Sequence, residues 1–403
     1  MNFHIPKIER ITGAATVSHF LLMFGYKLFS LFFPLFLFVR GFSLPEVGYV
    51  YLLIYLPIAV FSPIVGFLNH KINPAILADL GILGYAFYSL SMIVIQNQLV
   101  FYLCQILLGI SAALFFVSMR AVLMGSHLQN FDRSFGWFYS SPFYADAFAP
   151  VVGALFIWKF DFVGVFVLSL TFHIFNAIFC FLYLRKPALA LVDDGFELKR
   201  VILNYKKAFA KIKEKSILPF ILISFSILFL AGFYRAFFVL FLKDIGWSQN
   251  QILGFGSLLS VAFLPISILV IKKLESKKSK EHIIKGGLVF GLFTVLFGVL
   301  GFCFKFLFLF KAFYLTALII FLIIMAKSVG AFLANSSRSG LVSQELRQYP
   351  EEAGAIDTIF SPLGAAFGSL IAGLIVGFLG FSNLFILGGI FVLLIVSLMQ
   401  RVH

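Results

Sequence analysis

Apolar stretches of about 20 residues recur along almost the whole chain and are separated by short polar loops, and a transmembrane helix needs a stretch of this length to cross the hydrocarbon core. The 403 residues are 61% hydrophobic and only 12% charged. A soluble globular protein is about 45–50% apolar and 25% charged. The chain has more apolar residues than the buried core of a soluble protein could hold. The sequence therefore predicts an all-α integral membrane protein whose helices face lipid.

Segmentation of the apolar stretches predicts about twelve transmembrane helices. They cover residues 11–39, 46–68, 75–96, 98–125, 134–158, 161–184, 216–243, 250–271, 283–305, 308–336, 353–378 and 380–400. The longest polar run divides them into an N-terminal six-helix bundle (1–185), a cytoplasmic basic linker (186–215) and a C-terminal six-helix bundle (216–403). The linker's second half alternates apolar residues with Lys, which suits either an amphipathic helix on anionic head groups or a solvated basic loop.

Lys and Arg gather in the loops on one predicted side of the membrane. The other side holds only Arg40, Lys159, Lys243, Lys305 and Lys311. By the positive-inside rule, the sequence predicts a multi-pass protein of the cytoplasmic (inner) membrane with both termini in the cytoplasm. The net charge of +14 follows from this asymmetry, so it does not indicate a nucleic-acid partner. We expect membrane lipids as neighbours and a monomer.

The two predicted halves share short segments at matching places. Gly-Phe-Ser at residues 41–43 follows a Phe-Leu pair after the first span, and Gly-Trp-Ser at residues 246–248 follows another after the seventh. Ser-Pro pairs at residues 141–142 and 361–362 lie in the fifth and eleventh spans. Because these matches occur in the same order, they indicate an internal duplication.

Two six-span halves, a central basic loop and both termini inside resemble the major facilitator superfamily. That family typically carries G-x-L-A-D-R-x-G-R-R between spans two and three, and here the loop reads GFLNHKINP. Gly66, Leu68 and Lys71 fall on the pattern, whereas His70 stands at the place of the Asp and Asn73 at the place of a glycine. The motif is therefore degraded.

Two further segments carry the resemblance. In span four Gly109 matches a family glycine, although Gln105 stands where an Arg is expected. In span five Gly136, Pro150 and Gly153 are similar to a glycine-proline motif of the drug-exporting antiporters. The resemblance implies two pseudo-symmetric bundles that rock about a central site, hence a secondary active transporter (antiporter or symporter) and not an enzyme. It does not identify a subfamily.

Four ionisable residues lie at mid-membrane depth: Lys27, Asp146, Arg235 and Lys327. Charges are costly there unless they face protein or water, so such residues are functional candidates. We expect Lys27 and Arg235 to face each other across a water-filled centre with Lys327 nearby, or one base to form a structural ion pair with Asp146. Asp146 is a candidate for proton coupling or a fixed counter-ion.

Neighbouring polar residues complete the candidate substrate site. His19 and Ser30 share one helical face with Lys27, and Tyr234 precedes Arg235. Three bases against one carboxylate favour a small organic solute that is anionic or carries a phosphate or carboxylate group. The alternatives are multidrug or lipid-type efflux or flipping on the same fold, a membrane-embedded lipid-modifying enzyme, or a non-transporting receptor.

Residues near the cytoplasmic helix ends are candidates for a gate. They are Gly66, Lys71, Arg120 and Asp357. In the resembled family the loop that holds Lys71 approaches span eleven, where Asp357 lies, so the two either form a latch or are solvated helix ends. Cys104, Cys180 and Cys303 lie singly in apolar runs without ligand spacing, so we expect no metal and no cofactor.

Overall fold

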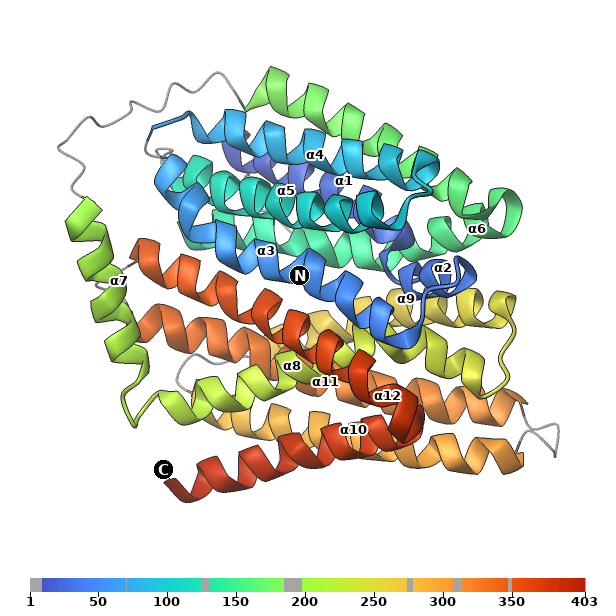
Figure 1. Ribbon diagram of the computed structural model, residues 1–403. Coiled ribbons are helices and arrows are strands. Elements are labelled where there is room, and N and C mark those ends of the chain that lie inside the picture. The colour runs from blue at the N-terminus through green and yellow to red at the C-terminus, as the bar shows by residue number, and fades with distance from the viewer. Residues whose placement is uncertain are drawn as a thin grey trace, which may run out of the picture. The chain divides into compact units, whose positions relative to one another are not determined.

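The computed structural model describes residues 9–69, 71–124, 131–184, 198–273, 278–307, 313–346 and 350–402. In these ranges the regular structure is helical, without strands (Figure 1). The helices are α1 (Arg10–Ser30), α2 (Phe33–Val39), α3 (Leu44–Leu68), α4 (Pro74–Val94), α5 (Gln98–Met124), α6 (Phe131–Tyr183), α7 (Leu198–Ile212), α8 (Leu218–Asp244), α9 (Gln249–Lys273), α10 (Ser279–Leu307), α11 (Phe313–Glu345) and α12 (Pro350–Val402).

Two of these helices contain two membrane spans each. α6 and α12 are each 53 residues long, and their backbone leaves the helical conformation at Asp161 (φ 57°) and Gly380 (φ 73°). Figure 1 shows the chain reversing direction within each of them. We call the parts before and after each break the first and second limbs. The predicted boundaries at residues 158–161 and 378–380 coincide with these breaks.

The described helices account for the predicted twelve spans. Eight are long and apolar enough to cross a membrane, and the bent pair α1 and α2 makes a ninth. The second limbs of α6 and α12 add two. α9 covers the predicted span at 250–271, although its described residues are not counted among the helices that are long and apolar enough. α7 is the linker helix. The main difference in length is α11, which continues to Glu345 instead of ending at 336, because helix ends depend on backbone hydrogen bonds and not on where the apolar run stops.

The chain groups into two compact units. The N-terminal unit contains Met1–Ser30 and Val60–Asp194, and the C-terminal unit contains Leu31–Ala59 and Gly195–His403. Residues 31–59 therefore pack with the C-terminal helices, although their place in the sequence put them in the first predicted bundle.

Helix packing follows the same order in both units. In the N-terminal unit α1 packs on α6, and α4 packs on α5 and on α6. In the C-terminal unit α8 packs on α12, and α10 packs on α11 and on α12. Helices at equivalent places in the two halves therefore pack against equivalent neighbours, as an internal duplication predicts.

The two glycine turns noted in the sequence have the same local geometry. Gly41 and Gly246 both have positive φ, at 85° and 96°. In each turn the N–H that follows the glycine donates to the carbonyl five residues earlier at 3.1 Å, which ends the preceding helix. Ser43 and Ser248 directly precede the next helix, and the backbone N–H of each donates at 2.8 Å to the side-chain oxygen three residues later. The repeat therefore extends to individual hydrogen bonds.

Candidate functional site

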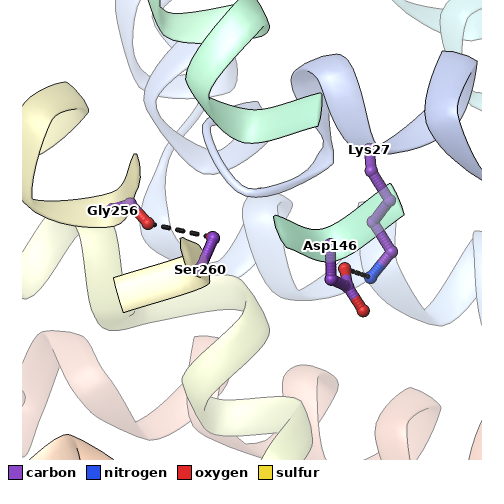
Figure 2. Close-up of polar contacts among 4 residues, drawn as sticks. All are labelled: Lys27, Asp146, Gly256 and Ser260. Atoms are coloured by element: carbon purple, nitrogen blue, oxygen red, sulfur yellow. Dashed lines mark hydrogen bonds and ion pairs between the residues drawn. The ribbon is translucent and has the colours of Figure 1, made fainter. Parts of the chain in front are cut away.

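Lys27 of α1 forms an ion pair in the N-terminal unit. Lys27 Nζ lies 2.7 Å from Asp146 Oδ1 on the first limb of α6 (Figure 2). The two side chains are 27% and 46% exposed, so the pair is accessible and not sealed in the helix packing. The sequence left open whether Asp146 would pair with a base, and the structure selects Lys27. The pair is neutral as a whole while both groups are charged.

A glycine contact sets the depth and closeness of the helices that carry this pair. A Cβ on Gly153 would overlap the carbonyl of Leu28, the residue next to Lys27. The backbones of α1 and of the first α6 limb therefore touch here, as small residues allow in membrane helices. This close approach is what lets Lys27 reach across to Asp146.

Side chains of α6 also hold α1 through its backbone carbonyls. The hydrogen bonds run from Ser141 Oγ to Thr16 O (3.0 Å), from Asn176 Nδ2 to Ser18 O (2.9 Å) and from His173 Nε2 to Leu22 O (3.3 Å). Because a carbonyl only accepts, His173 carries its proton on Nε2 in this arrangement. These three contacts were not predicted from the sequence, although isolated polar residues in apolar spans are the signal that could have found them.

His19 lies in the interior of the N-terminal unit. Its ring packs among three aromatic rings, and Nδ1 is hydrogen bonded to the carbonyl of Phe138 at 2.9 Å. Only 2% of the residue is exposed. Its Nε2 is buried and has no hydrogen-bond partner within the described residues, so the substrate-binding role expected from its helical face stays a prediction. Ser30, the last residue of α1, is half-buried and keeps its place as a candidate.

Two residues predicted to be close do meet in the C-terminal unit. Lys327 Nζ of α11 lies over the ring of Tyr234 of α8 and 5.4 Å from the ring centroid of Phe290 of α10. Lys327 is buried, with 5% exposure. Burial of a lysine against aromatic faces is favourable for the cation but does not replace a hydrogen-bond acceptor.

The guanidinium of Arg235 lies over a tyrosine of α3 in the same unit. Its Cζ is 5.1 Å from the ring centroid of Tyr55, which stacks in turn on Tyr51. Arg235 is exposed. Stacking uses the face of the guanidinium, whereas its N–H donors lie in the plane, where carboxylates and phosphates bind. Tyr55 was not among the residues singled out from the sequence.

The predicted partners Lys27 and Arg235 belong to different units, so their meeting across a water-filled centre stays a prediction. The gate also stays a prediction, because the side chain of Asp357 lies outside the described residues. Lys71 is exposed, with Nζ 4.7 Å from the Phe67 ring centroid. A Cβ on Gly66 would meet nothing within 4 Å. Arg120 is half-buried on α5.

Comparison with known proteins decides the family. The family model described as Major Facilitator Superfamily matches residues 15–356. The chain belongs to the Major Facilitator Superfamily. The repeated packing order of the two units and the twelve spans described above are thus those of a facilitator. No curated protein sequence matches the chain.

Solved structures agree with this assignment of the fold. A POT family transporter in complex with 5-aminolevulinic acid is 14% identical in sequence to this facilitator. The two structures superpose with a TM-score of 0.72 over 97% of this facilitator and 95% of that chain. The nucleoside transporter NupG is 12% identical, with 97% and 98% covered and a TM-score of 0.75. At these identities the likeness concerns the fold alone. Among the described residues, no group of three or more His, Cys, Asp or Glu is placed to hold a metal ion.

Proposed function

We propose that the chain is a secondary active transporter that moves a small organic anion across the cytoplasmic membrane by alternating access. Membership in the Major Facilitator Superfamily supports transport rather than enzymatic chemistry. Two units with the same packing order can exchange contacts at one interface without either refolding. The structural neighbours are a POT family transporter in complex with 5-aminolevulinic acid and a nucleoside transporter, and we assign the same size range to this solute.

The distribution of charge at mid-membrane depth carries the preference for an anion. Asp146 is matched by Lys27, which leaves the remaining bases, Arg235 and Lys327, in the C-terminal unit. Among the described residues of that unit, the Asp and Glu residues lie in the first or last turns of helices or just outside them, apart from Asp357, which is eight residues into α12. A solute with a carboxylate or phosphate group would therefore find net positive charge on one side of the proposed central site.

We assign roles to individual residues from this arrangement. The residues that contact the solute are Lys27, Arg235, His19, Ser30, Tyr234 and Lys327. Asp146 couples transport to protons, because a proton on its carboxylate removes the charge that holds Lys27 and frees the ammonium for the solute. Binding of the proton then raises the affinity for the solute, and binding of the solute raises the affinity for the proton.

The remaining parts of the proposal concern orientation and gating. The N- and C-termini lie in the cytoplasm of a monomer, and Lys71 pairs with Asp357 to close the cytoplasmic side. The basic loops that support this orientation are those identified in the sequence.

Uptake into proteoliposomes tests the proposal. The purified protein would be offered labelled carboxylates, phosphorylated solutes, neutral nucleosides and organic cations. Uptake of each would be measured without a proton gradient, with the vesicle interior acidic and with the exterior acidic. We expect saturable uptake of one or more anions that responds to the gradient. Transport of cations or lipids with no anion transported would replace the proposal by the efflux or flipping alternative, and no transport of any solute would favour a receptor.

A further inference from the structure

We propose that Lys327 and Tyr234 form an oxyanion-binding subsite inside the C-terminal unit, which takes the carboxylate or phosphate group of the solute. The inference deepens the transport function proposed above and rests on it for the identity of the ligand as a transported solute. The binding step itself can be measured without transport.

The first observation is the environment of the ammonium. Lys327 is 5% exposed, and its Nζ lies against the rings of Tyr234 and Phe290. Among the residues that the structure describes, no acceptor is hydrogen bonded to it and no carboxylate lies within ion-pair distance. Buried charges in proteins are normally paired, and in a membrane protein an ionisable residue of this kind marks a ligand or ion pathway.

The second observation is independent of the charge. The hydroxyl oxygen of Tyr234 is buried and has no hydrogen-bond partner within the described ranges. Buried tyrosine hydroxyls usually find a partner. The ring next to the ammonium thus carries its own unmet polar group.

The ammonium of Lys327 and the hydroxyl of Tyr234 suit the same kind of ligand. An ammonium has only donors, and a tyrosine hydroxyl donates readily to an anionic oxygen. A carboxylate or phosphate offers several acceptor oxygens together with negative charge, so one group can accept from both residues. An organic cation or an amide N–H would leave the ammonium unsatisfied.

The packing around both residues holds them in place. A Cβ on Gly330, three residues after Lys327, would meet the backbone of Phe290 and Gly286 at 2.7 and 2.8 Å, so α10 and α11 are in backbone contact there. The Tyr234 ring packs against rings at 5.2, 5.4 and 5.3 Å between centroids, from Phe238, Phe297 and Phe385. Preorganised donors lose little freedom when they bind.

A second lysine in the same unit provides the contrast. Lys243, at the end of α8, lies 4.0 Å from the ring centroid of Phe38, but it is exposed. Water can satisfy its donors, so its contact with an aromatic ring calls for no ligand. Lys243 is therefore the matched control for Lys327.

The test is ligand-induced thermal stabilisation of the purified full chain. The probes are inorganic phosphate, acetate and a short-chain phosphatidylglycerol, with choline chloride at the same ionic strength as the cation control. Binding stabilises the native protein in proportion to ligand excess. The variants are Lys327→Met, Tyr234→Phe and Lys243→Met.

We expect phosphate or acetate, and not choline, to stabilise the wild type and Lys243→Met alike. Lys327→Met should weaken binding by about 100-fold, as for a desolvated charge pair, and Tyr234→Phe by about tenfold, as for one hydrogen bond to a charged group. Without ligand, Lys327→Met should melt no lower than the wild type, because an apolar side chain replaces a buried charge. That readout separates loss of the subsite from loss of the fold.

The outcomes are distinguishable. Stabilisation by phosphate or acetate identifies a soluble oxyanion, and stabilisation by phosphatidylglycerol alone identifies a lipid head group at the same two residues. No stabilisation by any of the three probes, or equal stabilisation of wild type, Lys327→Met and Tyr234→Phe, overturns the subsite. Oxyanion binding that depends on Lys327 without uptake in proteoliposomes would leave the subsite standing and overturn transport.

Discussion

The ammonium of Lys27 lies 2.7 Å from a carboxylate oxygen of Asp146, which joins α1 to the first limb of α6. The pair is partly exposed, at 27% and 46% of the two side chains, so it is not enclosed by the helices around it. Exposed ion pairs contribute about 0.2–1 kcal/mol. An ion pair that contributes so little to the free energy of unfolding can form and break during transport.

Asp146→Asn should therefore affect transport far more than stability. We expect the free energy of unfolding to change by less than about 1 kcal/mol, while proton-driven uptake falls by roughly tenfold or more, equivalent to 1.4 kcal/mol. Thermal unfolding in detergent and uptake under a proton gradient provide the two measurements. The swapped variant Lys27→Asp with Asp146→Lys should recover stability but not uptake. Unchanged uptake in Asp146→Asn would remove the coupling role.

Gly153→Ala should separate α1 from α6. The new Cβ would overlap the carbonyl of Leu28, and overpacking of this kind costs about 1–3 kcal/mol. The displaced Leu28 is next to Lys27, so uptake should also slow. Gly254→Ala is the matched control, since a Cβ there meets nothing within 4 Å. Equal melting temperatures for the two variants would show that this backbone contact is dispensable.

The two repeat glycines should respond alike to substitution. Gly41→Ala and Gly246→Ala each place a side chain at positive φ, 85° and 96°, which costs about 1–2 kcal/mol for an L-residue. Thermal unfolding of each single variant would measure the effect, with Asn at the same positions expected to be milder because it tolerates this conformation. A large loss at one glycine and none at the other would argue against equivalent turns.

Arg235→Lys should weaken solute binding although it keeps the charge. Lysine does not provide the planar donors that the guanidinium presents while it stacks on Tyr55. We expect the apparent affinity for a transported anion to fall by about tenfold, or 1.4 kcal/mol, with Arg235→Gln falling further. Concentration-dependent uptake measures this, and Arg40→Lys outside the spans serves as the control. A lysine variant with wild-type affinity would place Arg235 outside the solute site.

The cytoplasmic latch predicts an effect of reversing charge. Lys71→Asp alone should favour opening on the cytoplasmic side, and Asp357→Lys in the same chain should restore closure if the two residues pair. Alkylation rates of an introduced cysteine in the cytoplasmic half of a span would follow the change. Identical rates in the single and double variants would leave both residues as solvated helix ends.

Several features of the chain could be read from the sequence because they depend on neighbours along the chain. The length of each apolar run determines whether a helix can cross a membrane, and Gly41 and Gly246 mark turns that need positive φ. The breaks at Asp161 and Gly380 fall where the apolar pattern changes. The Major Facilitator Superfamily resemblance rested on the same local information, summed over two similar halves.

Tertiary structure alone decided which side chains meet. The sequence placed Lys27, Asp146, Arg235 and Lys327 at similar depth but left open which would pair, because a contact between helices depends on the rotation and separation of each. Packing buried His19 among three rings and brought Lys27 to Asp146 through the close approach at Gly153. It also put Lys327 against Tyr234, and these distances follow from side-chain volumes on several helices at once, which no single stretch of sequence contains.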